Sequence, residues 1–319
     1  LNIAILWLGH YLVDFMIGIW PVYKTLVHLD LAKAGLIGGV CALAGEGMQI
    51  LFGSLSDKGY QKFIIAGGLL ATIASIFFTY TENYLAIFCL YLITCIGSGA
   101  FHPAAAGIMG GLHSDRKALL IAIFFSGGSL GLATSQLIFT QAHAFLEGKI
   151  ILLALPTICL ALFAYFFYLA RAAAAARKTE KKKIDFKIFL QFFKHRELRL
   201  LYITQVCNAT ILWGTMFLLP DILQQRNYDS WITYGGGHMM FILGIALMAV
   251  PAGYLADRYS SKNMIIVSAV MGVVFFYSFL FVPHLSNTSL LFLLFMLGAG
   301  LGISSPVAIA LGARLAPEY

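Results

Sequence analysis

Long apolar runs constrain this chain more than any other feature of its sequence. Ten runs are long enough, at about 1.5 Å of helical rise per residue, to cross a hydrocarbon core about 30 Å thick. Charged residues make up 11% of the 319 residues, against about a quarter in soluble domains. The sequence therefore predicts an all-α polytopic membrane protein with spans at residues 1–20, 34–55, 63–80, 84–111, 118–145, 150–170, 199–220, 231–255, 263–283 and 289–314.

The distribution of lysine and arginine gives these spans an orientation. If residue 1 is cytoplasmic, the cytoplasmic loops carry 17 of the 21 basic residues and the opposite side carries 4. Positive charge collects on the cytoplasmic side of membrane proteins, so we predict a cytoplasmic N-terminus. Ten of the basic residues fall between Arg171 and Arg199. The net charge of +7 therefore indicates topology, and nucleic-acid binding is not predicted.

A ten-residue polar segment occurs twice between consecutive spans. Gly53-Ser-Leu-Ser-Asp57-Lys-Gly-Tyr-Gln-Lys62 returns 200 residues later as Gly253-Tyr-Leu-Ala-Asp257-Arg-Tyr-Ser-Ser-Lys262. The glycine allows close helix packing, and an acid followed by a lysine can join neighbouring helix ends by charge. Internal repeats of this kind build many transporters. We expect these loops to gate the cytoplasmic side through Gly53, Asp57, Lys62, Gly253, Asp257, Arg258 and Lys262.

Prolines extend the repeat beyond the loops. Pro21 and Pro220 are predicted to end spans one and seven, and Pro103 and Pro306 are predicted to break spans four and ten. The offsets between the members of each pair are 199 and 203 residues. Spans one to four therefore match spans seven to ten.

Residues 171–198 separate two predicted domains. The first, at residues 1–170, is a six-helix bundle, and the second, at residues 199–319, is a matching bundle with four helices present. We expect two further helices after Tyr319, either deleted or unseen, and further residues before Leu1. The basic segment between the domains predicts either an amphipathic helix at the cytoplasmic surface or a solvated linker.

Four ionisable side chains inside the spans are candidates for the chemistry. Asp14 and Glu46 lie near the middle of spans one and two, His10 lies one helical turn before Asp14, and His102 precedes Pro103 in span four. A charge in the membrane interior is costly, so such residues often have a function. Either one acid binds a transported proton with a histidine as its relay, or His10 and Asp14 form a structural pair and His102 satisfies carbonyls freed by Pro103.

Small residues predict close contacts in spans four and five. Pro103 removes one backbone hydrogen bond, and Gly97 lies in the same span. Gly127, Gly128 and Gly131 would let two helices approach closely. We expect this second stretch to lie at a helix contact, and it could also act as a pivot between the halves.

The second half offers polar candidates without a matching buried acid. Gln205, Asn208 and Trp213 are predicted to line a substrate cavity. The sequence shows no Gly-rich nucleotide-binding loop, no catalytic triad and no metal-ligand cluster. We therefore predict neither an enzyme nor a bound cofactor or metal, and transport would be driven by a gradient.

Together these features resemble the major facilitator superfamily. Gly9-His-Tyr-Leu-Val-Asp14, Gly97-Ser-Gly-Ala-Phe-His-Pro103 and Ser126-Gly-Gly-Ser-Leu-Gly131 are similar to its fosmidomycin-resistance branch of bacterial drug exporters. That branch places an acid directly after the proline and a base three residues further, where this chain has Ala104 and Gly107. The resemblance implies two six-helix bundles that rock about a central site by alternating access.

The expected protein is thus a secondary transporter in a bacterial inner membrane. We expect a monomer in the lipid bilayer that exports a small amphiphilic or anionic molecule by proton antiport, as in antibiotic resistance. One alternative is a proton-coupled importer, a symporter of a small organic anion on the same fold. Another, of a different class, is a membrane sensor that has lost transport.

Overall fold

The computed structural model describes residues 2–111, 117–168, 194–258, 260–282 and 284–315. Within these residues all regular structure is helical, which confirms the all-α prediction. In the described part of the chain, eight stretches are long and apolar enough to cross a membrane. One of them, Leu31–Tyr80, holds the second and third predicted spans, and Ile150–Phe166 is a shorter apolar helix. Residues 171–193 of the basic segment, predicted as a surface helix or a linker, lie outside the described residues.

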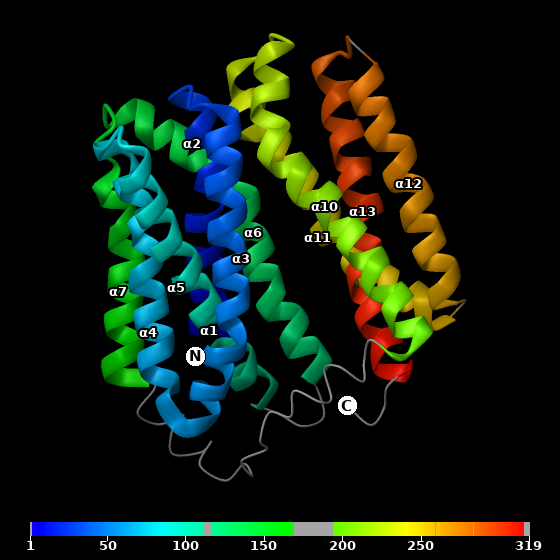
Figure 1. Ribbon diagram of the computed structural model, residues 1–319, viewed down its shortest axis with the longest axis horizontal. Helices are drawn as coiled ribbons and strands as arrows, with labels where there is room; N and C mark the ends of the chain where they lie inside the picture. The colour runs from blue at the N-terminus through cyan, green and yellow to red at the C-terminus, as the bar shows by residue number, and fades with distance from the viewer. Residues whose placement is uncertain (1, 112–116, 169–193, 259, 283, 316–319) are drawn as a thin grey trace. The chain divides into compact units, whose positions relative to one another are not determined.

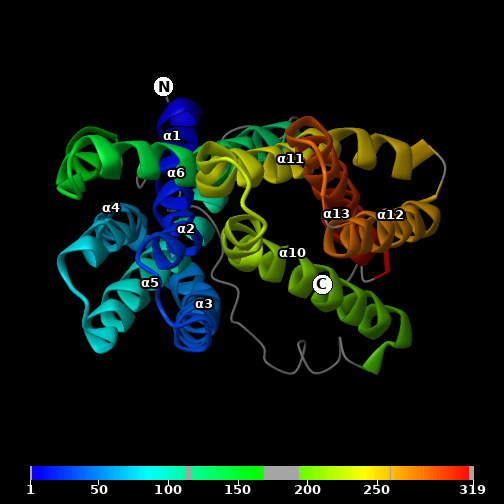
Figure 2. The ribbon, with the colours of Figure 1, turned by 90° about the horizontal axis from the view of Figure 1, so that it is seen from above.

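The chain divides into two compact units, residues 1–182 and 183–319. The helices of the first unit (Figure 1) are α1 (Asn2–Ile17), α2 (Ile19–Leu26), α3 (Leu31–Leu55), α4 (Gln61–Thr72), α5 (Tyr84–Gly111), α6 (Lys117–Phe145) and α7 (Leu155–Phe163). Helix α4 continues as the tighter 3-10 segment Ile73–Tyr80, and the 3-10 segment Ile150–Ala154 leads into α7. Helix α1 contacts α4, α5, α6 and α7, so it lies inside this bundle (Figure 2).

Local sequence signals set where these helices begin and end. The Asp30 carboxylate accepts a hydrogen bond from the backbone N–H of Lys33 at 2.8 Å and so caps the start of α3, because the first amides of a helix lack backbone partners. The Asn83 side chain accepts hydrogen bonds from the Leu85 and Ala86 amides before α5. Gly59, at φ 94°, reverses the chain between α3 and α4. The first copy of the repeated loop is therefore a tight turn.

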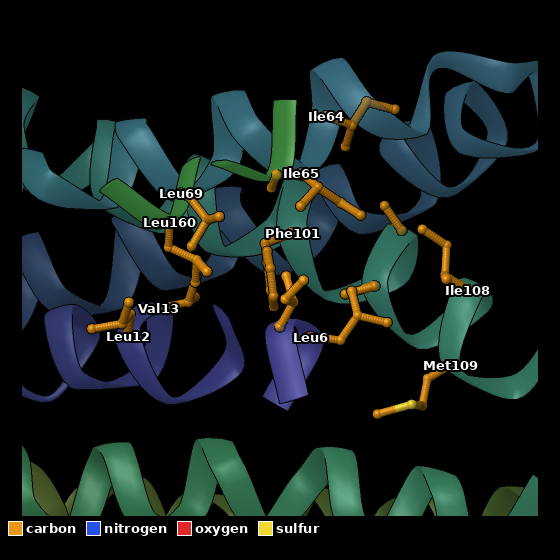
Figure 3. Close-up of a cluster of buried hydrophobic side chains, with 14 of the residues drawn as sticks. Leu6, Leu12, Val13, Ile64, Ile65, Leu69, Phe101, Ile108, Met109 and Leu160 are labelled. Carbon is orange, nitrogen blue, oxygen red and sulfur yellow. The ribbon is translucent and has the colours of Figure 1, made fainter. Parts of the chain in front are cut away.

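An apolar core joins α1, α4, α5 and α7 (Figure 3). Val13 from α1, Leu69 from α4, Phe101 from α5 and Leu160 from α7 belong to one cluster of buried side chains. The lipid-facing surface is also apolar, so shape matching between neighbouring side chains, and not burial from water, holds such helices together. This core fixes α1 and α5, the two helices that carry His10, Asp14 and His102.

Glycines bring the helices of the first unit into backbone contact. A Cβ atom at Gly131 would overlap the Tyr11 carbonyl of α1, and one at Gly127 would crowd the Trp7 carbonyl one turn earlier. Gly97 of α5 meets the backbone of α4 at Gly68 in the same way. The predicted glycine stretch of span five thus lies against α1 of its own unit.

The second unit contains α10 (Arg196–Gln225), α11 (Gly237–Arg258), α12 (Ser261–Phe281) and α13 (Asn287–Leu315). Helix α13 packs against all three other helices (Figure 1). The closest approach is between α11 and α13, where a Cβ at Gly298 would overlap the Phe241 carbonyl and one at Gly244 would overlap the Phe295 carbonyl. The Ser260 hydroxyl caps α12 by accepting from the Asn263 amide.

The prolines do not end or break helices as predicted. Pro103, Pro220 and Pro306 lie inside α5, α10 and α13, which continue on both sides of them. Pro21 lies inside α2, and the helix interruption precedes it at Gly18. A proline removes one N–H and frees one carbonyl, but the adjoining turns keep their hydrogen bonds, and helices in a membrane tolerate this defect.

Candidate functional site

Three ionisable side chains of the first unit converge inside the bundle. His10 and Asp14 come from α1 and His102 comes from α5. The Nε2 atom of His10 lies 3.1 Å from Nε2 of His102. The two oxygens of Asp14 face one ring each, with Oδ2 3.3 Å from His10 Nε2 and Oδ1 3.2 Å from His102 Nε2. We call His10, Asp14 and His102 the triad.

Backbone carbonyls fix which ring nitrogens carry hydrogen. His10 Nδ1 lies 2.7 Å from the Phe124 carbonyl oxygen, and His102 Nδ1 lies 2.8 Å from the Ser98 carbonyl oxygen. A carbonyl oxygen can accept but not donate a hydrogen bond, so each Nδ1 must carry the hydrogen. In a neutral imidazole the other nitrogen is then an acceptor. Both Nε2 lone pairs therefore point into the triad.

The triad consequently brings acceptor atoms together without a donor between them. Two neutral imidazoles and an ionised carboxylate would leave lone pairs facing one another at 3.1 to 3.3 Å. Buried acceptors without partners are costly, and a buried uncompensated charge is more so. One cation held between the three side chains, such as a shared proton, turns these close contacts into attractive ones.

The surroundings of the triad are apolar and close-packed. The His10 ring stacks on Phe124 with centroids 4.1 Å apart, and Phe101 and Phe125 are its other aromatic neighbours. The side chain of His10 is 3% exposed, that of Asp14 15% and that of His102 23%. The triad is therefore accessible from the side of His102 and Asp14, and His10 is its most deeply buried member.

Gly128 of α6 leaves space beside the triad. A Cβ atom at this position would overlap both His10 Nε2 and Asp14 Oδ2. The absence of a side chain at Gly128 thus leaves room for His10 Nε2 and Asp14 Oδ2. This explains the glycine at this position of the predicted stretch more directly than helix packing alone.

Glu46, the other predicted acid, lies outside the triad. It is exposed on α3, and its carboxylate accepts a hydrogen bond from the Gln49 amide at 2.5 Å. It is near enough to interact electrostatically with both Asp14 and His102. Glu46 is therefore not one of the groups that meet in the triad, although its carboxyl group is within electrostatic reach of two of them.

The polar candidates of the second unit make contacts between helices. The Gln205 amide donates to Ser304 Oγ at 2.7 Å, and the Asn208 amide donates to the Leu301 carbonyl at 3.3 Å. Both bonds join α10 to α13. Trp213 is 52% exposed on the same helix. Gln205 and Asn208 therefore join α10 to α13.

The two copies of the repeated loop differ in the contacts of their residues. Asp57 is exposed, and Lys62 Nζ lies 4.8 Å from the centre of the Phe63 ring and 5.2 Å from that of Tyr165. A Cβ at Gly53 would make an ordinary contact with Pro103 at 3.6 Å. In the second copy, a Cβ at Gly253 would meet nothing within 4 Å. Close packing inside each unit therefore does not require either glycine.

The remaining second-copy residues lie at the junction of α11 and α12. Arg258 ends α11, and Lys262 is exposed in the first turn of α12. The side chain of Asp257 lies outside the described residues.

Sequence reasoning missed two groups that orient the triad. Ser98 lies one helical turn before His102, and its hydroxyl and carbonyl oxygens lie 3.2 and 2.8 Å from Nδ1. The spacing of four residues on one helix could have indicated this contact. The Phe124 carbonyl belongs to α6, 114 residues from His10, and no sequence signal marks it.

The fold defines a class: a multi-pass helical membrane protein. Comparison with known proteins agrees with this class. The profile of the Major Facilitator Superfamily matches residues 3–319. The chain belongs to that superfamily.

Two proteins with similar sequences are uncharacterized MFS-type transporters. It is 24% identical over 336 residues to an uncharacterized MFS-type transporter of Methanocaldococcus jannaschii, covering 100% of this chain and 84% of the relative. It is 22% identical over 169 residues to the uncharacterized MFS-type transporter YfnC of Bacillus subtilis, covering 51% and 41%.

The fold is similar to that of a bacterial homolog of the human lysosomal transporter Spinster, solved inward-facing and unoccupied. The TM-score is 0.70 at 14% identity, over 98% of this chain and 77% of the other. The occupied inward-facing form of the same homolog gives a TM-score of 0.65 at 12% identity, over 96% and 72%. At these identities the likeness shows the fold alone.

Proposed function

We propose that this protein is a secondary active transporter that exports a small amphiphilic or anionic molecule in exchange for protons. The observation that carries the proposal is the triad of His10, Asp14 and His102, in which three side chains share one space for a cation. Membership of the Major Facilitator Superfamily supports the transport part of the proposal. The triad supports the coupling part.

The proton is the coupling ion because the triad has the geometry of a shared hydrogen bond. The 3.1 Å between the two Nε2 atoms is a hydrogen-bond distance that needs one hydrogen between two lone pairs. Asp14 lies within 3.3 Å of both nitrogens and balances the positive charge. Loading and releasing this proton would change the net charge of the triad and the hydrogen bond that ties α1 to α5.

Alternating access would connect this change to the substrate. In the alternating-access scheme for transporters with repeated halves, the two bundles rock about a central site. The cytoplasmic loops at Asp57 and Asp257 would close one side of that site. Gln205, Asn208 and Trp213 would contribute to the substrate cavity from the second bundle. We place the protein in a bacterial inner membrane as a monomer, with the linker between the bundles in the cytoplasm.

The similarity of three motifs to the fosmidomycin-resistance branch supports export of a drug-like compound. The motifs are the stretches at residues 9–14, 97–103 and 126–131. The first two contain the triad, and the third contains Gly128 beside it. Ala104 and Gly107 differ from the branch pattern, so this chain would recognise its substrate with other groups.

A liposome assay tests this proposal. The full protein is reconstituted with a pH-sensitive dye inside, and phosphonates, organic anions and amphiphilic drugs are added singly. We expect one class to move protons in wild type and not in Asp14→Asn, because the amide cannot balance a shared proton. Glu82→Gln, an exposed loop acid, is the matched control and should behave as wild type.

Each outcome of this assay has a distinct meaning. Substrate flux without proton movement in wild type would exclude proton coupling and indicate a uniporter or another coupling ion. Proton movement in the same direction as the substrate would favour the importer. A folded protein that moves none of the compounds would weaken the transport proposal and favour the sensor.

A further inference from the structure

We propose that the triad of His10, Asp14 and His102 is also a binding site for a divalent transition-metal ion of the Zn²⁺ type. No metal site was predicted from the sequence, because the ligands come from two helices with His102 92 residues after His10. The inference concerns metal binding and does not depend on the proposed transport.

The distances between the ligand atoms suit such an ion. With metal–nitrogen and metal–oxygen bonds of about 2.0–2.1 Å, neighbouring ligands of a tetrahedral ion lie about 3.3 Å apart. In the triad the two Nε2 atoms lie 3.1 Å apart, and they lie 3.2 and 3.3 Å from the two different oxygens of Asp14. One ligand atom from each residue can be chosen so that all lie within 4.8 Å of one another. The Asp14 carboxylate faces the two rings with both oxygens, so it can bind through one oxygen or both.

The hydrogen bonds of the rings prepare both Nε2 atoms for coordination. Metal-binding histidines usually donate their second ring N–H to a carbonyl or carboxylate, which fixes the tautomer and the ring orientation. Here the Phe124 and Ser98 carbonyls accept from Nδ1 of His10 and His102 at 2.7 and 2.8 Å. Both coordinating lone pairs are thus already directed into the triad.

Gly128 of α6 lies directly against two of the three ligand atoms. An added Cβ there would overlap His10 Nε2 and Asp14 Oδ2, so this glycine keeps the approach to two of the three ligands open. The aromatic rings of Phe101 and Phe124 exclude water from the His10 side. Two imidazoles and a carboxylate leave a fourth position open, as in sites where a metal holds water or substrate.

The ligand set also determines which ions should bind. Imidazole nitrogen suits Zn²⁺, Co²⁺ and Ni²⁺, whereas Mg²⁺ and Ca²⁺ prefer oxygen ligands. Because two of the three ligands are nitrogens, we expect the first group to bind and the second to be excluded.

Co²⁺ binding to the purified, tag-free full chain tests the inference. We expect one Co²⁺ per protein with the visible absorption of a tetrahedral nitrogen–oxygen site, and competition by Zn²⁺ but not Mg²⁺. His102→Gln and Asp14→Asn should each weaken binding at least about 100-fold, since even the loss of an outer partner of a metal ligand costs 10- to 100-fold. His28→Asn and His284→Gln remove exposed histidines outside the triad and should leave binding unchanged.

The Gly128→Ala variant tests whether a bound metal ion lies at the triad or elsewhere in the protein. Its three ligands remain, but the new methyl group would occupy the space beside them, so we expect the tetrahedral Co²⁺ spectrum to be lost in protein that still elutes as a single species. Absence of Co²⁺ binding in folded wild type would overturn the inference. Binding that survives in Asp14→Asn and His102→Gln, or that disappears in the two control variants, would also overturn it. Proton movement without metal binding would overturn this inference and leave the proposed function standing.

Discussion

At the scale of single residues, the triad depends on positions that the sequence indicates only in part. The pair His10 and Asp14 was predicted from their spacing on one helix, and the 3.3 Å contact confirms that they share a face. His102 was a separate candidate, because no local pattern shows that α5 crosses α1 at this point. The carbonyls of Ser98 and Phe124 could not be predicted, since every residue carries one.

Gly128→Ala should destabilise the protein through overpacking. The methyl group would overlap His10 Nε2 and Asp14 Oδ2, and forcing an extra group into a packed interior costs about 1–3 kcal/mol. Gly47→Ala on α3 is the control, because its Cβ would meet nothing within 4 Å and a helical alanine gains up to about 1 kcal/mol over glycine. Reversible unfolding in mixed detergent micelles measures both, and equal stability of the two variants would contradict the account.

At the scale of helices, the sequence predicted where the helices lie more accurately than where they are interrupted. Apolar length places the spans, because each must cross the same hydrocarbon layer. The prolines were misjudged because an isolated helix in water would break at Pro103 or Pro306, whereas neighbouring helices hold α5 and α13 together. Glycine contacts such as Gly298 against Phe241 set which helices pair, and the partner of a glycine is not encoded locally.

Arg226→Ala should weaken the connection between α10 and α12. The guanidinium donates to the carbonyl oxygens of Phe279 and Leu280 at 2.6 and 2.7 Å, where α12 ends and its carbonyls lack helical partners. Hydrogen bonds from a charged donor contribute about 1.5–3 kcal/mol, so we expect a loss of this order in the free energy of unfolding. Arg199→Ala, at an exposed position of α10, should change it by less than about 0.5 kcal/mol.

At the scale of the whole molecule, the sequence predicts an orientation as well as a fold. The family and the helical architecture are shown. The predicted cytoplasmic position of the N-terminus rests on the 17-to-4 distribution of basic residues. The identity of the substrate could not be predicted, because it depends on the shape of a cavity formed by side chains distant in sequence. The direction of transport stayed open between the expected exporter and the alternative importer.

Cysteine labelling in intact cells tests the orientation. Lys149→Cys, in the exposed loop before α7, should react with a membrane-impermeant maleimide added outside. Lys58→Cys, exposed in the first repeated loop, should react only after the membrane is permeabilised. The wild-type protein gives the background from its native cysteines. The reverse pattern would place the N-terminus outside and contradict the predicted topology.

The central claim is that the triad binds the coupling proton, and the transport behaviour of Asp14→Asn tests it most directly. Once a substrate is known, liposomes are loaded with it, and two rates are compared: exchange of labelled for unlabelled substrate, and accumulation driven by an imposed pH gradient. The account predicts that Asp14→Asn still exchanges substrate, because the variant can still alternate between its two open states. It predicts no accumulation of substrate, because the variant binds no proton through which the pH gradient could drive transport. Accumulation at the wild-type level in Asp14→Asn would show that the proton binds elsewhere and would contradict the account.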